Sequence, residues 1–344
     1  MSNRNTTNYI YYLLDQLLKD SLREVAIVTS DLQMSKELKT QLIEQCKDTV
    51  GNDLDGRIPL NIAVIGPPGC GKSSFLNTIF ASFKNNDRAC WREIAKMGDY
   101  GGHGIQETSR LRIYPKQAYI EDSNNLALMP TFLDITGLED EESEINKEML
   151  RILFNGKLKE REDLNSVRQY YFNNGQNIQK LRRLYNKRSE NARVDRIIVV
   201  CTSNGILPLP ESLLRAIRET AKIRSREIPV YGVLTHADKQ RLNDSQYIDR
   251  QTRFRNHLGL IDTRFKCIAN YCTDFDPTGS YISTTLPELD NPVLELMTQV
   301  LYHLPDDTII PDDTITLDEP ISWKKIAFAI IIILLAILLM KIKS

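Results

Sequence analysis

Residues 66–73 read G-P-P-G-C-G-K-S and fit the phosphate-binding pattern G-x-x-x-x-G-K-[ST]. An apolar run at 60–65 precedes the pattern and a helical pattern at 74–83 follows it, which is the context that such a loop requires. Glycines allow a tight turn whose backbone N–H groups point at phosphate oxygens, and the start of the next helix adds partial positive charge. Lys72 should reach the β- and γ-phosphates, and the Ser73 hydroxyl should bind Mg²⁺.

The candidate nucleotide-binding residues of this loop are Gly66, Gly69, Cys70, Gly71, Lys72, Ser73 and Ser74. Pro68 has no N–H and cannot contact phosphate through its own amide. Cys70 is interpreted as a small residue that fills the loop, and a redox role is the alternative.

A second phosphate element is predicted where the apolar strand 131–133 ends in Asp134-Ile135-Thr136-Gly137, about sixty residues after the loop. Asp134 should hold Mg²⁺, and the Gly137 N–H should sense the γ-phosphate. Asp134 as a helix N-cap is the structural alternative. The next residue is Leu138, where small GTPases carry a glutamine that orients the attacking water. We therefore expect slow turnover, or a catalytic group supplied by the charged insert at about 139–196 or by a partner.

The glycine-rich stretch 101–109 lies between these two motifs. A mobile switch with Thr108, or Ser109, on Mg²⁺ fits this position, and a loop without a ligand fits it equally well. Lys72 and Thr108 are the candidate catalytic residues, and Ser73, Thr108 and Asp134 are the candidate metal ligands.

A base-reading loop is predicted at Thr235-His236-Ala237-Asp238, after the apolar strand 230–234. GTPases carry [NT]-K-x-D there, and the aspartate accepts hydrogen bonds from guanine N1–H and the N2 amine. His236 replaces the lysine whose stem covers the ring, so it should stack there instead, and base choice stays open. Asp238 as a helix cap is the alternative. Backbone N–H groups of Ala269 and Asn270, after a further strand at 265–269, could meet guanine O6.

Together these motifs resemble the interferon-induced protein 44-like family of GTPases over about residues 58–303. The resemblance is carried by G-K-S-S-F-L-N at 71–77, D-I-T-G-L-E at 134–139, L-T-H-A-D at 234–238 and N-Y at 270–271. It implies a Ras-like G domain, GTP/GDP as bound nucleotide, and a role in innate immunity or stress. The C-terminal tail described below is not a feature of that family.

The elements that must position these residues alternate between strand and helix patterns, which predicts an α/β fold with a mostly parallel sheet and helices on both faces. Strands are expected at 60–65, 111–114, 131–133, 197–201, 230–234 and 265–269. The expected domains are an N-terminal helical region at 1–57, a P-loop G domain at 58–303 with a charged helical insert at about 139–196, an acidic linker at 304–320, and a membrane anchor at 321–344.

Two helices are expected in the N-terminal region, with apolar stripes at 10–25 and 38–46. They should pack on the main domain, and a dimerisation or membrane-contact surface is the alternative. The basic run 181–188 of the insert is interpreted as a solvated helix face, with contact to anionic lipid or an acidic partner as the alternative.

The composition is globular, and the net charge of -1 gives no sign of nucleic-acid binding. The cysteines form no C-x-x-C pair, which makes a zinc cluster unexpected and favours reduced thiols in the cytosol. Ser2 stands where N-myristoylation would need glycine.

The C-terminal anchor is predicted from Ile326–Met340, an apolar run with lysines on both sides. Fifteen residues make a helix of about 22 Å, short against about 30 Å of hydrocarbon, and a buried core helix is the alternative. Flanking lysines can snorkel, and a short span suits a thin membrane such as the endoplasmic reticulum or the outer mitochondrial membrane.

Three functions fit these observations. The first is a membrane-anchored GTPase that needs Mg²⁺ and turns over slowly or with help from a second copy or a regulatory partner. The second is a GTP-binding scaffold or switch with little hydrolysis. The third is an AAA-type ATPase, whose P-loop is similar but whose adjacent acidic pair has no counterpart after Asp134.

Overall fold

The structure of the chain is a computed structural model that describes residues 33–84, 91–96, 110–120, 127–135, 138, 140–189, 192–205, 207–223, 226–239, 245–272 and 286–302. Contacts divide the chain into two units, Met1–His303 and Leu304–Ser344, and every described residue belongs to the first. The predicted helix at 10–25, the linker at 304–320 and the apolar run Ile326–Met340 therefore lie outside the described residues.

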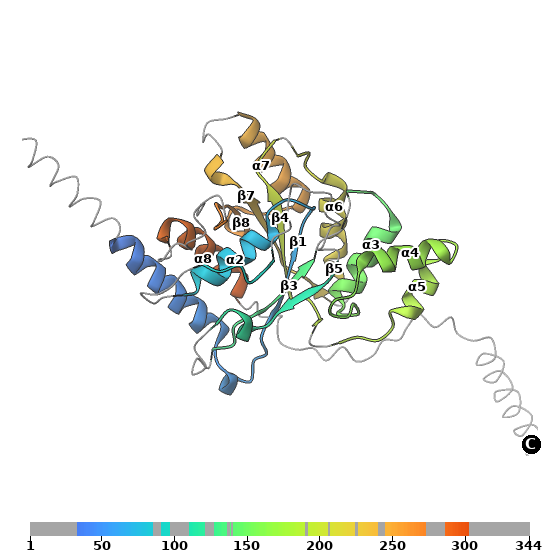
Figure 1. Ribbon diagram of the computed structural model, residues 1–344, viewed down its shortest axis with the longest axis horizontal. Coiled ribbons are helices and arrows are strands. Elements are labelled where there is room, and N and C mark those ends of the chain that lie inside the picture. Colours follow the sequence, from blue (N-terminus) through green and yellow to red (C-terminus); the bar gives the residue numbers. More distant parts are fainter. Residues whose placement is uncertain are drawn as a thin grey trace, which may run out of the picture. The chain divides into compact units, whose positions relative to one another are not determined.

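A sheet of six strands forms the centre of the first unit (Figure 1). Its order is β2-β3-β1-β4-β7-β8, and only β2, at one edge, is antiparallel to its neighbour. The strands are β1 (Asn61–Ile65), β2 (Arg112–Tyr114), β3 (Thr131–Ile135), β4 (Arg196–Thr202), β7 (Val230–Thr235) and β8 (Phe265–Cys267). The prediction of a mostly parallel sheet is confirmed.

Two strands beside each other, β5 (Lys222–Ile223) and β6 (Arg226–Glu227), form a separate antiparallel pair. The helices are 33–50, α2 (Lys72–Ser82), α3 (Glu144–Phe154), α4 (Leu164–Asn173), α5 (Ile178–Leu184), α6 (Glu211–Thr220), α7 (Ser245–Leu258) and α8 (Pro287–Leu301). Short 3-10 helices lie at η1 (Asp53–Asp55), η2 (Lys116–Ala118), η4 (Ala237–Lys239) and η5 (Asp262–Arg264).

Both faces of the sheet are covered, because every residue of β1 and β4 is buried. Successive side chains of a strand point to opposite faces, so Ile62 and Val64 pack in one core and Ala63 and Ile65 in the other. Helix 33–50, α2 and α8 supply the core on the first face, and α3, α6 and α7 supply the core on the second (Figure 1). Helices on both faces were predicted, and this is confirmed.

Helix 33–50 packs on the sheet domain through one apolar stripe. Leu42, Ile43, Cys46 and Val50 are buried in the same core as α8. Leu38, which the periodicity also assigned to the stripe, is 40% exposed. For this helix the stripe serves packing.

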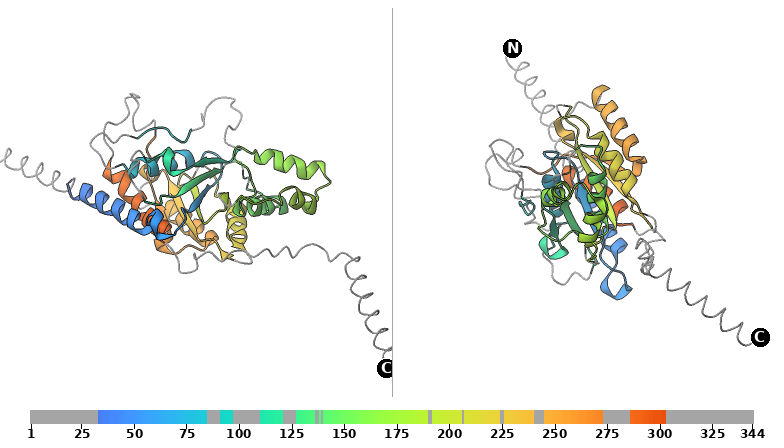
Figure 2. Two further views of the ribbon diagram at one scale, coloured as in Figure 1. Left: turned by 90° about the horizontal axis from the view of Figure 1, so that it is seen from below. Right: turned by 90° about the vertical axis from the view of Figure 1, so that its right-hand side faces the viewer.

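The charged insert contains the three helices α3, α4 and α5 (Figure 2). Its first helix, α3, is part of the second core, since Ile145, Met149 and Leu153 are buried there. In the basic run, Leu181 is buried and Arg182 pairs with Glu148 at 2.9 Å, so the run is anchored to α3 at its start.

Candidate functional site

The loop between β1 and α2 is held in a tight turn by its glycines. Gly69 and Gly71 have φ angles of 71° and 85°, in the left-handed region that residues with a Cβ rarely adopt. A Cβ on Gly66 would lie 1.9 Å from the carbonyl oxygen of Val200, so this glycine lets the loop lie directly against β4. Gly71 is the N-cap of α2, which begins at Lys72. The phosphate-binding motif therefore has the strand, loop and helix that it requires.

Lys72 is buried, with 3% of its surface exposed. Its Nζ donates hydrogen bonds to the carbonyl oxygens of Gly66, at 3.0 Å, and Pro67, at 2.7 Å. The ammonium group is thus inside the loop that it was predicted to serve. Ser73 and Ser74, in the first turn of α2, are partly exposed and follow directly.

Cys70, a residue of the phosphate-binding loop, is fully buried. Burial raises the pKa of its thiol, while the neighbouring charge of Lys72 acts in the opposite direction. A reactive cysteine needs an accessible thiolate, so Cys70 fits a residue that fills the loop and does not fit a redox handle.

Asp134 lies inside β3, which continues two residues beyond the predicted strand end. The extension has a physical reason, since Asp134 and Ile135 both pair in register with β1. The N-cap alternative for Asp134 is wrong, because α3 is capped by the side chain of Ser143.

The Asp134 side chain is buried, and its Oδ1 has no hydrogen-bond partner in the part of the chain that the structure describes. Burial raises the pKa of this carboxyl, and the positive charges of Lys72 and Arg112 lower it. A buried carboxylate oxygen without a partner, facing a loop lysine, is chemically suited to a hard divalent cation. Ser73 and Asp134 therefore fit the predicted Mg²⁺ site.

The predicted base-reading loop meets the phosphate-binding loop at Thr235, the last residue of β7. Its Oγ1 donates to the carbonyl oxygen of Cys70 at 2.7 Å. A Cβ placed on Gly71 would lie 3.3 Å from Thr235 Oγ1 and 3.5 Å from Asn270 Nδ2. Three segments that are far apart in the sequence thus converge around Gly71.

No protein-family model matches the chain, and no curated protein matches it in sequence. Among solved structures, the chain is similar to Toc33 from Arabidopsis thaliana in complex with GDP and Mg²⁺. The identity is 13%, the TM-score is 0.40, and the match covers 78% of this chain and 95% of that one. A second similar structure is Toc33 in complex with Mg²⁺ and GMPPNP, with 13% identity, a TM-score of 0.37, and coverage of 78% and 92%.

A further similar structure is a probable GTP-binding protein, engB, with 12% identity, a TM-score of 0.29, and coverage of 61% of this chain and 88% of that one. These values are too low to carry function from those proteins to this one. The resemblance to the interferon-induced protein 44-like family stays a prediction.

His236 stands where GTPases usually carry a lysine. Its φ is 60°, which is left-handed. Its Nδ1 lies 3.0 Å from Thr235 Oγ1 and 3.1 Å from Thr202 Oγ1.

Asp238 lies in η4 and is exposed, so its carboxylate is available to a ligand. It does not cap α7, which begins at Ser245. The segment after β8 lies beside this loop, since the Ala237 N–H donates to the Ile268 carbonyl oxygen at 3.3 Å. In that segment, Asn270 is buried beside Thr78 of α2, whose Oγ1 lies 3.4 Å from Asn270 Oδ1. Ala269 is partly buried and packs against a buried cluster that includes Ala81 of α2.

Leu138 is 1% exposed and belongs to the second core. A side chain held there cannot position a water molecule beside a phosphate. The other predicted residues of this region, Thr108, Ser109, Gly137 and Glu139, lie outside the described residues.

Three polar residues of the site were missed by the sequence analysis. Arg112 is the register partner of Asp134 across β2 and β3. Thr202 is the last residue of β4 and Ser203 follows it, and Ser203 Oγ donates to the His236 carbonyl oxygen at 3.0 Å. Hydroxyls that follow a buried parallel strand are a signal that could have found the last two, because strand ends at one edge of a sheet meet.

No helix in the described ranges is long and apolar enough to cross a membrane. The predicted anchor at 326–340 lies outside those ranges.

Proposed function

We propose that this chain binds GTP and GDP with Mg²⁺ and hydrolyses GTP slowly. The observation that carries the proposal is the hydrogen bond from Thr235 to the carbonyl oxygen of Cys70. It joins a loop suited to phosphate with a loop that presents a carboxylate, Asp238, at the same edge of the sheet. One ligand with a polyphosphate at one end and a hydrogen-bonding base at the other would contact both.

The phosphate end is supported by the positive-φ glycines, the start of α2 and the buried Lys72. Ser73 and Asp134 would hold Mg²⁺, which supplies charge neutralisation at the phosphates when it is bound. Lys72 remains the candidate catalytic residue, as a positive charge that stabilises the phosphate oxygens.

The base end is supported by the exposed carboxylate of Asp238. Guanine offers two donors, N1–H and the N2 amine, to such a group, and adenine offers no matching pair. Ala269 and Asn270 would contact guanine O6 through their backbone N–H groups, and the adjacency of their segment to the base-reading loop supports this. Whether the ring of His236 stacks on the base stays a prediction, although one ring edge is already bonded to hydroxyls.

Slow hydrolysis is supported by Leu138, which is packed in the core where a water-orienting residue would be needed. The same observation favours the alternative, a GTP-binding scaffold or switch that barely hydrolyses. Single-turnover hydrolysis by the full chain, alone and at concentrations that favour self-association, separates the two. A rate that rises with concentration supports a second copy as the source of a catalytic group.

An AAA-type ATPase is the less supported alternative. That class needs adjacent acidic residues at a strand end to activate water, and here Asp134 is followed by the buried Ile135. It also leaves the contact between Thr235 and the phosphate-binding loop without a function.

Base choice is tested by measuring the affinity of the full chain for GTP, GDP and ATP in the presence of Mg²⁺. Asp238→Asn should weaken GTP binding about tenfold to hundredfold, because a carboxamide presents a donor to a donor edge and two charge-assisted hydrogen bonds are lost. Asp48→Asn, on the exposed side of helix 33–50, is the matched control and should change nothing. A wild-type preference for ATP, or full GTP affinity in the Asp238 variant, would refute the guanine assignment.

We further propose that the segment 326–340 anchors the chain in the endoplasmic reticulum or the outer mitochondrial membrane, with the nucleotide domain in the cytosol. Its support is the unbroken apolar run with flanking lysines. Carbonate extraction and localisation of the full chain, compared with a chain that ends at Pro320, test it. Equal membrane distribution of the two chains would show that the segment is no anchor. An immune or stress role stays a prediction from the resemblance.

A further inference from the structure

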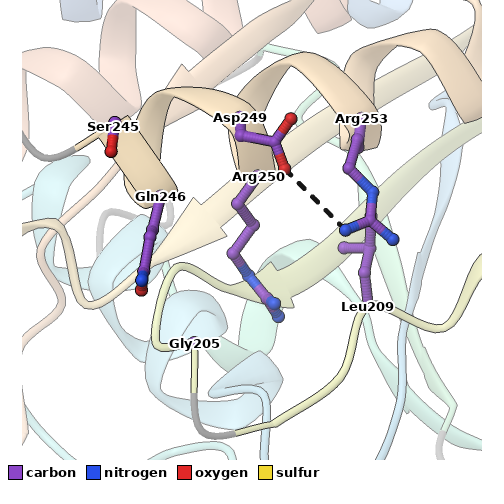
Figure 3. A pocket seen from close by; sticks show the side chains of 7 residues that line it. All are labelled: Gly205, Leu209, Ser245, Gln246, Asp249, Arg250 and Arg253. Atoms are coloured by element: carbon purple, nitrogen blue, oxygen red, sulfur yellow. Dashed lines mark ion pairs between the residues drawn. The ribbon is translucent and has the colours of Figure 1, made fainter.

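A cavity of about 530 Å³ lies beside the base-reading loop, on the opposite side of β4 and β7 from α2. Gly205 and Leu209, in the loop after β4, line one wall, and Ser245, Asp249, Arg250 and Arg253 of α7 line the other (Figure 3). Its volume is in the range of small-molecule sites, about 300–1,000 Å³. Neither the phosphate-binding loop nor Asp134 contributes to it.

The close packing of α7 on β7 directs the Arg250 side chain toward the sheet. A Cβ on Gly232 of β7 would lie 2.6 Å from Phe254 Cε1 and 2.4 Å from Leu260 Cδ1, so this glycine lets α7 lie close to the sheet. Phe254 is fully buried at that contact. Arg250 precedes Phe254 by four residues and therefore shares its helix face. Arg250 Nε donates to the carbonyl oxygen of Thr202 at 2.8 Å.

The two arginines of the cavity differ in their partners. Arg253 pairs with Asp249, at 3.8 Å, and with Glu211, so its charge is balanced (Figure 3). Arg250 Nη2 is buried and has no hydrogen-bond partner within the described part of the chain. Burial also lowers the pKa of Arg250, although a guanidinium remains charged at neutral pH. A buried cationic donor without a partner costs stability until a ligand meets it.

We propose that this cavity binds a small ligand that carries an oxyanion, either a carboxylate or a phosphate, and that the guanidinium group of Arg250, which lines the cavity, is its cationic partner. A guanidinium presents planar N–H groups that match such oxygens. Leu209 supplies an apolar wall for the rest of the ligand, and Asp249 disfavours a ligand with several negative charges at that end. The site does not depend on whether the chain binds nucleotide.

The cavity is connected to the base-reading loop by two hydrogen bonds. Arg250 donates to the backbone of Thr202, and Thr202 Oγ1 lies 3.1 Å from His236 Nδ1. A ligand that draws the guanidinium toward itself would therefore act on the residue that replaces the usual base-covering lysine. This second effect rests on the proposed function, and the binding of the anion does not.

The test titrates the full chain in mild detergent with inorganic phosphate and, separately, with succinate, by calorimetry in a chloride buffer. A Lys72→Ala background removes the charge with which phosphate would bind the phosphate-binding loop. Saturable binding of at least one anion is expected, and the identity of that anion assigns the ligand as a phosphate or a carboxylate. Absence of saturable binding by both would overturn the proposal.

Variants locate the bound anion. Arg250→Gln should weaken the affinity for the anion at least about tenfold, because a charge-assisted donor is lost. Arg253→Gln, from the same wall, should weaken anion binding less than Arg250→Gln does, because Arg253 already pairs with Glu211 and Asp249. Arg250→Lys keeps the charge and should bind better than Arg250→Gln. Unchanged affinity in Arg250→Gln, or an equal loss in Arg253→Gln, would place the anion elsewhere.

A measurement on the unmutated side chain keeps the test decisive if Arg250→Gln fails to fold. Phenylglyoxal modifies arginine, and mass spectrometry reads the rate at each position. The anion should slow modification of Arg250 and leave the rate at Arg253 unchanged. An unprotected Arg250 at a saturating anion concentration would refute the proposal. Nucleotide affinity measured with and without the anion then reports the connection to His236 separately.

Discussion

Two buried aspartates, in two regions of the molecule, have opposite surroundings. Asp290 lies where helix 33–50, α2 and α8 meet, and both of its oxygens have partners. Lys39 Nζ lies 2.8 Å from Oδ2, while Ser82 Oγ and Tyr271 OH each donate to Oδ1 at 3.1 Å. Asp134, at the phosphate-binding edge, has an Oδ1 with no such partner in the described ranges.

Burial raises the pKa of both carboxyls, so desolvation does not distinguish them. Their partners do. The satisfied carboxylate ties together three helices and the segment that follows Asn270, which is a structural task. The carboxylate with an unpartnered oxygen is held in place at an energetic cost, which is the mark of a group that serves a ligand. Substitutions in the two regions should therefore affect different properties.

The largest effect is expected at Lys39→Met, which leaves the Asp290 carboxylate buried without its cation. The free energy of unfolding of the full chain should fall by about 3–5 kcal/mol. Lys47→Met on the same helix removes a partly exposed pair with Glu44, and the expected loss is at most about 1 kcal/mol. Urea denaturation followed by fluorescence measures both. Equal losses would mean that the buried pair is no more important than a surface one.

Asp134→Asn should act on ligand binding instead of folding. Its Mg²⁺-dependent gain in GDP affinity should fall about tenfold to hundredfold, while GDP affinity in EDTA stays unchanged. The free energy of unfolding should not decrease, because the amide replaces a carboxylate whose charge is disfavoured by burial and whose Oδ1 has no partner in the described ranges. Calorimetric titration with and without Mg²⁺ reports the first and urea denaturation the second. A loss of stability like that of Lys39→Met would erase the distinction between the two regions.

Tyr271→Phe removes one of the three donors to Asp290 and keeps the ring. We expect the free energy of unfolding to fall by about 1–2 kcal/mol, since a hydrogen bond to a charged group is lost while Lys39 remains. Tyr302→Phe is the matched control, because Tyr302 is 61% exposed. Thermal unfolding of the two variants under the same conditions measures the difference. Unchanged stability of Tyr271→Phe would mean that Lys39 and Ser82 alone stabilise the Asp290 carboxylate.

The smallest effect is a dependence on pH. Burial places the folded pKa of Asp134 above its unfolded value, so the folded chain holds this proton more tightly. The resulting stability is fully present below the unfolded pKa and is lost as the pH rises through the folded pKa. In EDTA, the Tm of the wild type should therefore fall more with rising pH than that of Asp134→Asn. Parallel curves would show that Asp134 is ionised equally in both states.

The fold was predictable wherever the sequence carries its own local signal. Each of the six ranges predicted as strands contains an observed strand. The clearest signals are those of β1 and β4, because a buried parallel strand is a continuous apolar run. The phosphate-binding loop was predictable because its glycines, lysine and helix start are adjacent. The end of β3 was set too early, since the polar Asp134 interrupts an apolar run that the backbone pairing with β1 continues.

The parts that escaped prediction depend on contacts between distant residues. Lys39 and Asp290 are separated by 251 positions, and neither lies in a pattern that marks the other. Arg112 faces Asp134 only because β2 pairs antiparallel to β3. In the sequence, Arg250 is one of several charged residues of α7. Its proposed role in anion binding follows from the close approach of α7 to β7 that Gly232 permits. Such partners are set by tertiary packing, which one sequence does not display.

The two edge strands of the sheet have a consequence for self-association. β2 and β8 are three residues long each. An edge of that length offers few free N–H and C=O groups, which makes the sheet a poor template for pairing with a strand of another molecule. Two copies of this chain cannot readily join by extending the sheet from one to the other. An assembly built from this domain has to use helix faces or the loops at the ligand-binding edge, where a neighbour could add a side chain to the site.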